Sequence, residues 1–186
     1  EPLLHPKLPD FIAYAKSKGI LETIINTNAT RLNDKKAKDL ISAGLDFIIY
    51  SFDGGTKETY EKMRPGRFRE NRFEDVYENI KRFHAIRNEL RSALPYTKIQ
   101  MIMTKETFDE KELFFNLFSD CVDDVSVSQY SERGGELADI DAATEASYEK
   151  ALNEFNLPKG TPYMKDPRGN LFLSKTRKPC EQPFQR

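Results

Sequence analysis

An uninterrupted apolar run, Phe47 to Tyr50, ends abruptly in Ser51, Asp53 and the glycines at positions 54 and 55. Apolar character without alternation is typical of a parallel strand that is covered on both faces. In barrels and open sheets of parallel strands, ligands bind where the strands end and the next loops begin. Two glycines at that point let the backbone turn sharply and approach a ligand closely. The run therefore predicts a buried strand with a binding site at its carboxyl end.

Helical and strand-like patterns alternate along the first 130 residues. Strands are predicted at residues 22–26, 47–50, 98–103 and 122–127, and helices at residues 8–18, 33–43, 56–63, 72–90 and 110–118. Asn33 or Asp34 can cap the second of these helices. Strands that alternate with helices over short connections form βαβ units and a parallel sheet. Because crossovers between parallel strands are right-handed, all strand ends are expected on one side of the sheet.

From residue 131 onward this alternation stops. Residues 142–156 have the pattern of one more helix, and residues 157–186 are rich in Pro, Gly and Lys. Such a composition is typical of a linker or of the edge of a following module.

The composition argues against several functional classes. The chain has 186 residues, enough for one domain with its own core, and its 29 basic and 30 acidic residues give no overall attraction to nucleic acid or to an acidic membrane surface. No stretch approaches the roughly 18 apolar residues that span a bilayer. The two cysteines, Cys121 and Cys180, do not make a disulfide scaffold, which favours a reducing cytoplasm.

Five predicted strand-end loops bring polar side chains to one edge of the sheet. They contain Glu1 with Pro2, residues 26–28, Ser51 with Asp53, residues 100–104, and residues 128–130. Their hydroxyls, amides and carboxylates can hold a small polar molecule that carries an amine, a carboxylate and a ribose. Arg64 follows the Ser51 loop by one short helix, so its guanidinium can pair with a carboxylate.

Several of these residues also have a simpler interpretation. Ser51 and Asp53 are standard helix N-cap residues, and taken alone capping is the stronger interpretation for them. Thr27 and Asn28 can form only a turn, because Asn tolerates unusual backbone angles. Cys121 precedes a predicted buried strand and fits a small core residue. From the residues alone, these alternatives stay open.

The order and spacing of these segments resemble those of the radical S-adenosylmethionine (radical SAM) enzymes. Residues 1–2 (Glu-Pro) resemble the end of the family's Gly-Gly-Glu-Pro motif, which holds the methionine amino group. Residues 27–29 (Thr-Asn-Ala) are similar to the Thr-Asn-Gly turn after the third barrel strand. Residues 51–54 (Ser-Phe-Asp-Gly) resemble the Ser-Leu-Asp-Gly signature, whose serine contacts bound S-adenosylmethionine.

Three further segments fit the same family. Residues 60–64 resemble a segment in which an arginine commonly meets the methionine carboxylate. Residues 100–103 fit the fifth strand, and residues 125–130 fit the sixth strand near the adenine pocket. The resemblance therefore implies cofactor contacts from Glu1, Pro2, Thr27, Asn28, Ser51, Asp53, Arg64, Gln100 and Tyr130.

The resemblance also implies the fold and the domain organisation. Residues 1–135 are expected to form part of a (β/α)6 TIM-like barrel and to supply about its third to sixth strands. Residues 136–186 are expected to hold a linker and the start of an auxiliary-cluster (SPASM or twitch) extension, in which Cys180 is the first ligand of an auxiliary iron–sulfur cluster. The implied substrate is a peptide or a small molecule, and the implied electron donor is a flavodoxin or ferredoxin.

One departure from the family is clear. The Cys-x3-Cys-x2-Cys loop that holds the catalytic [4Fe–4S] cluster is absent, and two cysteines cannot supply three thiolates at that spacing. That loop belongs upstream of Glu1, so we expect the chain to be part of a longer protein and to be inactive alone. The complete enzyme is expected to cleave S-adenosylmethionine reductively to a 5′-deoxyadenosyl radical that abstracts hydrogen from the substrate.

Two other functions remain compatible with the residues. The first is a noncatalytic α/β module that binds a nucleotide-like ligand and no iron. The second is a cluster-free barrel enzyme that uses Asp53 or Glu1 as an acid or base, for which the sequence shows no partner residue. A cysteine motif upstream of Glu1 would distinguish the radical enzyme from both.

Overall fold

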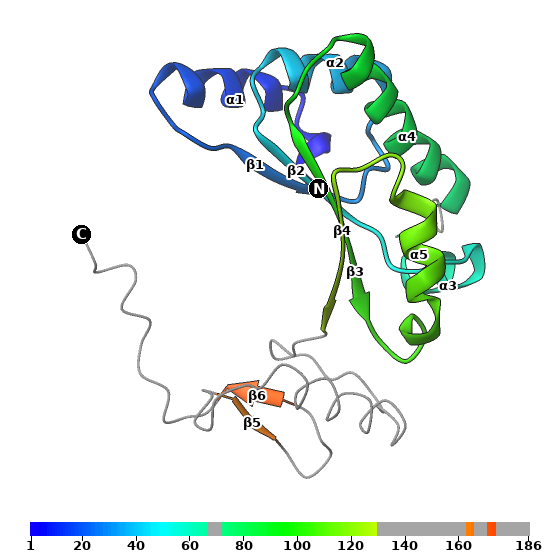
Figure 1. Cartoon of the computed structure of the whole chain (residues 1–186). Coiled ribbons are helices and arrows are strands. Elements are labelled where there is room, and N and C mark those ends of the chain that lie inside the picture. The colour runs from blue at the N-terminus through cyan, green and yellow to red at the C-terminus, as the bar shows by residue number, and fades with distance from the viewer. Residues whose placement is uncertain (67–71, 130–162, 166–170, 174–186) are drawn as a thin grey trace. The chain divides into compact units, whose positions relative to one another are not determined.

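The computed structural model describes residues 1–66, 72–129, 163–165 and 171–173. The chain divides into two units, residues 1–128 and residues 129–186. The first unit is built on a four-stranded parallel sheet in the order β1-β2-β3-β4, and its helices lie along one side of that sheet (Figure 1). This arrangement confirms the predicted α/β class and the predicted partial TIM-like barrel.

Strands and helices alternate along the chain, except that two helices follow one another after β2. The strands of the sheet are β1 (Ile24–Thr27), β2 (Phe47–Ser51), β3 (Tyr96–Met103) and β4 (Asp124–Gln129). The helices are α1 (Leu8–Ser17), α2 (Asp34–Ser42), α3 (Lys57–Met63), α4 (Phe73–Glu89) and α5 (Lys111–Phe118), with 3-10 turns η1 (Pro2–Leu4) and η2 (Phe108–Glu110). The predicted elements before residue 131 are all present, with ends displaced by two residues or fewer. Within the described ranges, no helix combines the length and apolarity needed to cross a membrane.

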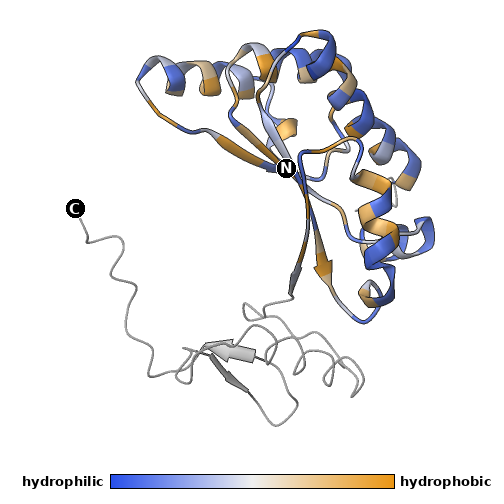
Figure 2. Ribbon diagram, in the orientation of Figure 1, coloured by the Kyte–Doolittle hydropathy of each residue, from blue (hydrophilic) through white to orange (hydrophobic). Residues whose placement is uncertain are grey.

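Alternate residues of the strands separate a buried face from a half-buried one. Ile48 and Tyr50 of β2, like Ile99 and Met101 of β3, are at most 1% exposed. The Tyr50 ring meets Phe83 of α4 edge to face, so this face of the sheet packs against the helices. Figure 2 shows apolar residues concentrated on the strands, while the helices carry many hydrophilic residues. Burial of side chains of this size contributes about 1.5–3 kcal/mol each.

The prediction that β2 is covered on both faces holds for only one face within the described residues. Phe47 and Ile49 are half-buried, while the residues between and beyond them are buried against the helices. The physical reason is the barrel architecture, in which the second face of each strand points to the barrel interior. A continuous apolar run therefore indicates a parallel strand here without indicating two helical layers.

Local sequence signals set the helix ends. Asn33 caps α2, because its Oδ1 accepts a hydrogen bond from the Lys36 N–H at 3.0 Å. Of the two predicted caps, Asn33 is the one used. Gly44 follows α2 with a φ of 83°, a left-handed conformation that stops the helix. A side-chain cap of this kind contributes about 1 kcal/mol.

A carboxylate ties β1 to β2 at the amino ends of the strands. Asp46 precedes β2, and it accepts hydrogen bonds from the Thr23 N–H at 2.7 Å and the Thr23 hydroxyl at 2.8 Å. Lys16 of α1 pairs with the same carboxylate at 2.9 Å. The hydrogen bond from Lys16, together with those from Thr23, lowers the pKa of Asp46 although some burial opposes it. We call this set the Asp46 network.

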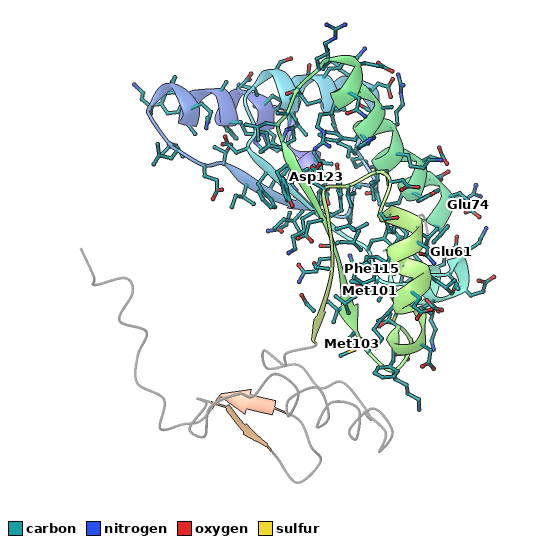
Figure 3. The ribbon with its side chains drawn as sticks, in the orientation of Figure 1. Glu61, Glu74, Met101, Met103, Phe115 and Asp123 are labelled. Atoms are coloured by element: carbon teal, nitrogen blue, oxygen red, sulfur yellow. The ribbon has the colours of Figure 1, made fainter. Side chains whose placement is uncertain are left out.

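The same device recurs between β3 and β4. Asp123 precedes β4 and accepts hydrogen bonds from the Thr97 N–H at 2.7 Å and the Thr97 hydroxyl at 2.8 Å. The guanidinium of Arg87 on α4 pairs with it, and Arg87 also donates to the Pro95 carbonyl at 2.9 Å. Burial alone would raise the pKa of Asp123, but hydrogen bonds from Arg87 and Thr97 lower it to about 2. Figure 3 places this Asp123 network toward the opposite end of the sheet from Met103.

In the second unit, β5 (Tyr163–Lys165) and β6 (Leu171–Leu173) form an antiparallel pair in which Met164 lies opposite Phe172. The interpretation of residues 136–186 as a linker and the start of an extension did not include this pair, because three-residue strands are too short to show alternation. The predicted helix at 142–156 lies outside the described residues, as do Tyr130 and Cys180.

Candidate functional site

Polar residues at the carboxyl ends of the strands lie on the face that the helices leave uncovered, which we call the inner face. The pairing register places Ser51 beside Gln100 and Ile49 beside Lys98. Asn26 of β1 lies beside Ile49. Lys98 in turn pairs with a carboxylate of β4, Asp124, at 2.8 Å. Ser51 and Gln100 therefore bring polar groups from two neighbouring strands together at the carboxyl end of β2, the edge where parallel barrels hold their ligands. The Lys98–Asp124 pair lies nearer the amino ends, because Asp124 is the first residue of β4.

Ser51 is the last residue of β2 and is half-buried. Its hydroxyl has no hydrogen-bond partner within the part of the chain that the structure describes. Beside it, the Gln100 side-chain amide donates to the Ser128 hydroxyl of β4, and the Gln100 carbonyl accepts from the Phe52 N–H at 3.0 Å. The structure thus brings Ser51 and Gln100 together, and the Ser51 hydroxyl keeps both its donor and its acceptor capacity for a ligand.

Glu1 lies at the end of β1. Its Oε1 accepts hydrogen bonds from the Thr27 hydroxyl at 2.7 Å and from the Leu3 N–H at 3.1 Å. Its Oε2 accepts from the Asn28 N–H at 2.9 Å. Pro2 begins η1, directly after this carboxylate. Because a carboxylate has about four acceptor positions, Glu1 can hold the β1 loop and still accept one bond from a ligand.

The turn after β1 has the strained geometry that the family pattern suggests. Ala29 has a φ of 57° and is fully buried, although this conformation favours glycine. The Asn28 Oδ1 accepts hydrogen bonds from the Thr30 N–H at 3.1 Å and the Thr30 hydroxyl at 2.7 Å. Asn79 of α4 donates to the Ala29 carbonyl at 3.0 Å. The turn interpretation of Thr27 and Asn28 therefore describes their backbone well, and it leaves the Asn28 amide nitrogen unused by these bonds.

Asp53 and Arg64 form an ion pair beside Ser51. The Asp53 Oδ2 accepts from the Arg64 Nε at 2.7 Å and lies 2.6 Å from its Nη2. The Asp53 Oδ1 accepts from the Ile102 N–H of β3 at 2.7 Å. The Asp53 side chain is 8% exposed and that of Arg64 is 23% exposed. Asp53 therefore orients Arg64, and the guanidinium keeps further N–H groups for an anionic partner.

The helix-capping interpretation of Ser51 and Asp53 is wrong. Thr56 is the N-cap of α3, and its hydroxyl accepts from the Thr59 N–H at 3.3 Å. Asp53 pairs with Arg64 instead, so at the end of β2 it orients a guanidinium and does not cap a helix.

The two glycines that follow allow a close approach, as predicted, but the neighbour is the chain itself. A Cβ on Gly54, whose φ is 139°, would lie 2.6 Å from the Tyr60 nitrogen. A Cβ on Gly55 would lie 2.7 Å from the Glu110 carbonyl oxygen. Glu110 was not among the predicted site residues, and its contacts with this turn join residues about 55 positions apart in the sequence. No local pattern signals such a contact.

The described residues do not fit a catalytic iron–sulfur cluster, and the whole sequence contains only two cysteines. Among the described residues, no three His, Cys, Asp or Glu side chains lie close enough together to hold a metal ion. Cys121 is buried, and burial raises the pKa of its thiol to about 11, so it is a poor thiolate ligand at neutral pH. It fits the core role that its position predicted.

The parallel sheet with helices along one side defines a partial α/β barrel protein, and its Ser51 and Arg64 lie at the strand ends, where such barrels bind ligands. The sequence model of the radical SAM superfamily matches residues 1–117, and the chain belongs to this superfamily. Membership implies radical chemistry that starts from S-adenosylmethionine and a [4Fe–4S] cluster. The predicted family is thereby confirmed.

Three curated relatives show the range of proteins that share this sequence pattern. The chain is 39% identical over 64 residues to the Fe-coproporphyrin III synthase of Methanosarcina barkeri, covering 34% of this chain and 16% of the relative. It is 33% identical over 85 residues to the GTP 3′,8-cyclase of Chlorobaculum tepidum, covering 46% and 24%. It is 28% identical over 114 residues to the tungsten-containing aldehyde ferredoxin oxidoreductase cofactor-modifying protein of Pyrococcus furiosus, covering 59% and 30%. The matches span less than a third of each relative.

Solved structures of the Streptococcus suis protein SuiB share the fold. SuiB bound to S-adenosylmethionine superposes with a TM-score of 0.56 at 16% identity, over 84% of this chain and 33% of SuiB. SuiB bound to its precursor peptide SuiA gives a TM-score of 0.58 at 15% identity, over 84% of this chain and 34% of SuiB. At this level of identity the likeness establishes the common architecture.

Proposed function

We propose that this chain forms the S-adenosylmethionine-binding part of a radical SAM enzyme that abstracts hydrogen from a peptide or a small molecule. The observation that carries the proposal is the Ser51 hydroxyl, which lies beside Gln100 and has no partner among the described residues, at the position of the family's Ser-Leu-Asp-Gly signature. Bound S-adenosylmethionine, reduced by one electron from a [4Fe–4S] cluster, supplies the 5′-deoxyadenosyl radical, and the protein orients it and excludes water.

The ends of β2 and α3 supply one side of the cofactor site. Ser51 offers its hydroxyl to the cofactor. Arg64, held by Asp53 at 2.6–2.7 Å, donates its remaining N–H groups to the cofactor carboxylate. Charge-assisted hydrogen bonds of this kind are about twice as strong as neutral ones. The Asp53 contact thus prepares Arg64 for an anion before the ligand arrives.

The β1 end supplies the groups for the cofactor amine. Glu1 keeps accepting capacity on its carboxylate after bonding to Thr27 and Asn28, and a protonated amine is the matching donor. Pro2 fixes the chain direction next to that carboxylate. Tyr130 completes the proposed set near the adenine, on the resemblance alone.

A peptide substrate is supported by the fold shared with SuiB, which has been solved with its precursor peptide. The segment around Cys180 resembles the start of a SPASM or twitch extension, and we propose that Cys180 is a ligand of an auxiliary iron–sulfur cluster there. A flavodoxin or ferredoxin would deliver the electron. The proposed setting is a reducing cytoplasm, and the low cysteine count supports it.

Anaerobic reconstitution of the full-length protein with iron and sulfide tests the function directly. With dithionite and S-adenosylmethionine, we expect formation of 5′-deoxyadenosine. Binding of S-adenosylmethionine by calorimetry without any cleavage would instead support the noncatalytic binding module. A protein that neither binds nor cleaves the cofactor contradicts the proposal.

Two substitutions test the site itself. Ser51→Ala and Arg64→Ala should each weaken S-adenosylmethionine binding by about tenfold, because each removes a hydrogen-bonding group that the cofactor would otherwise use. Ser17→Ala and Arg82→Ala are matched controls, since Ser17 is on the exposed side of α1 and Arg82 forms surface ion pairs. Calorimetric affinities equal to those of the wild type at Ser51 and Arg64 would refute these assignments.

A further inference from the structure

Glu110 lies at the end of η2, between β3 and α5, and its carboxylate is turned toward the loop after β2. We propose that Glu110 is a positioning residue that holds the segment 51–56 in its cofactor-binding shape. This inference rests on the function proposed above. It assigns a role to a side chain that has no place in the family-like motifs of the sequence.

Four hydrogen bonds join Glu110 to the start of α3. Its Oε2 accepts from the Gly55 N–H at 2.7 Å and from the Thr56 N–H at 3.2 Å. Its Oε1 accepts from the Thr56 hydroxyl at 2.8 Å and from the Thr59 hydroxyl at 2.6 Å. Burial opposes the charge on Glu110, but these hydrogen bonds outweigh it and lower its pKa. The carboxylate is therefore ionised at neutral pH and occupied by the turn.

Backbone packing leaves this turn little freedom to move. Gly55 lies so close to the Glu110 carbonyl oxygen that a Cβ would be 2.7 Å from it, and 2.9 Å from the Leu113 Cβ. On the other side of the turn, Phe52 is fully buried, and Asp53 bonds to the Ile102 N–H. The segment 51–56 is thus fixed at both of its ends, and Glu110 is the anchor at the far end.

The position of Ser51 and Arg64 follows from this anchoring. Ser51 is the first residue of the segment that Glu110 anchors at its far end. Arg64 is the C-cap of α3, the helix whose first turn Glu110 binds. A tilt of α3 or of the turn would move the serine hydroxyl and the guanidinium relative to each other. A ligand that contacts both groups is therefore sensitive to Glu110 without touching it.

A purely stabilising role is the competing explanation, and the molecule contains a matched control for it. Asp123 is also a carboxylate that accepts several hydrogen bonds across two elements, but it lies at the amino ends of the strands. Replacing either carboxylate removes comparable bonds and should lower the thermal midpoint. Only the Glu110 change should alter cofactor affinity.

The test titrates S-adenosylmethionine into the reconstituted full-length protein and records the thermal midpoint of each variant. We expect Glu110→Gln to weaken binding about tenfold, because a neutral amide cannot accept all four bonds, while Asp123→Asn stays within about twofold of the wild type. Hydrogen exchange gives a second readout. Cofactor should slow exchange in the segment 51–56 of the wild type and slow it less in Glu110→Gln.

Thr59→Val keeps the carboxylate and removes a single bond, so it remains informative where Glu110→Gln does not fold. It should weaken binding about threefold. Wild-type affinity and wild-type protection of segment 51–56 in these variants, with a lowered thermal midpoint, would overturn the inference and leave a structural role. A wild-type protein that binds no S-adenosylmethionine would overturn the proposed function, and this inference with it.

Discussion

The two ends of the parallel sheet use polar side chains in different ways. At the amino ends, Asp46 and Asp123 each accept hydrogen bonds from a threonine at or just before the start of the neighbouring strand, and each pairs with a cation from a helix. At the carboxyl ends, Ser51 keeps an unpartnered hydroxyl within the described residues, and the carboxylates there hold loops in place. In barrels of parallel strands the first end serves stability and the second carries function. With the site proposed above, this chain would have the same division within four strands.

The amino-end networks also reveal a repeat that the sequence does not display. In both networks, a threonine near the start of one strand donates its N–H and hydroxyl to an aspartate just before the next strand. The cation is a lysine in one and an arginine in the other. The residues share no motif, because the recurrence is one of geometry. The comparison can be tested with substitutions at each end.

The largest effect is expected at the aromatic anchor under the functional end. Phe52 is fully buried, stacks on Tyr60 with ring centroids 4.1 Å apart, and meets Phe118 at 4.9 Å. Phe52→Ala should lower the free energy of unfolding by about 4 kcal/mol, measured by chemical denaturation. Tyr96→Ala is the control at the other end, where the residue is 39% exposed and the loss should be about 1 kcal/mol. Equal losses would show that the functional end has no special anchor.

The two amino-end networks should differ in strength. The Arg87 side chain is 7% exposed, whereas that of Lys16 is 31% exposed. Asp123→Asn leaves Arg87 buried without its charge partner and should lower the free energy of unfolding by about 3 kcal/mol. Asp46→Asn should cost about 1 kcal/mol, because water can solvate Lys16. If urea titrations gave the same loss of unfolding free energy for Asp123→Asn and Asp46→Asn, the distinction between a buried and a surface network would be wrong.

A smaller effect is expected from acid. The pKa of Asp123 is about 2 in the folded protein, below the ordinary aspartate value near 3.8. A carboxylate whose pKa is lowered by folding stabilises the protein above its unfolded pKa and loses this contribution as pH falls through the folded value. Stability should therefore fall by about 1–2 kcal/mol between pH 4 and pH 2 because of Asp123, after allowance for its partial exposure. Denaturation midpoints of Asp123→Asn should lack this component, and an unchanged acid slope in that variant would contradict the assignment.

Much of the first unit was predictable because its signals are local. The apolar run at Phe47, the Asn33 cap and the glycine stop at position 44 each act within a few residues. The strand-end rule predicted that the Ser51 and Gln100 loops reach one edge of the sheet, and the pairing register places these two residues side by side. Local chemistry and the geometry of parallel strands together were sufficient for these features.

Other features depended on contacts that no window of sequence contains. Glu110 bonds to residues 51 to 55 positions away, and its place at a predicted helix start gave no sign of this. Asp53 is a typical cap residue, but its partner is Arg64, which follows the helix that the capping interpretation assigned to it. The short β5 and β6 lack enough residues for a periodic pattern. These features depend on the three-dimensional structure and could not be predicted from the sequence.

The alternation of side chains along the strands has a consequence for how such a protein can change. In β2, Ile48 and Tyr50 belong to the core, while Ile49 and Ser51 belong to the inner face. Successive positions of one strand are therefore constrained differently: one set by packing in the core and the other by the inner face. A substitution on the inner face, such as one at Ile49, therefore leaves the buried core between the sheet and the helices unchanged. In such a sheet, the residues that determine the fold and the residues that line the inner face are different, so each set can change without the other.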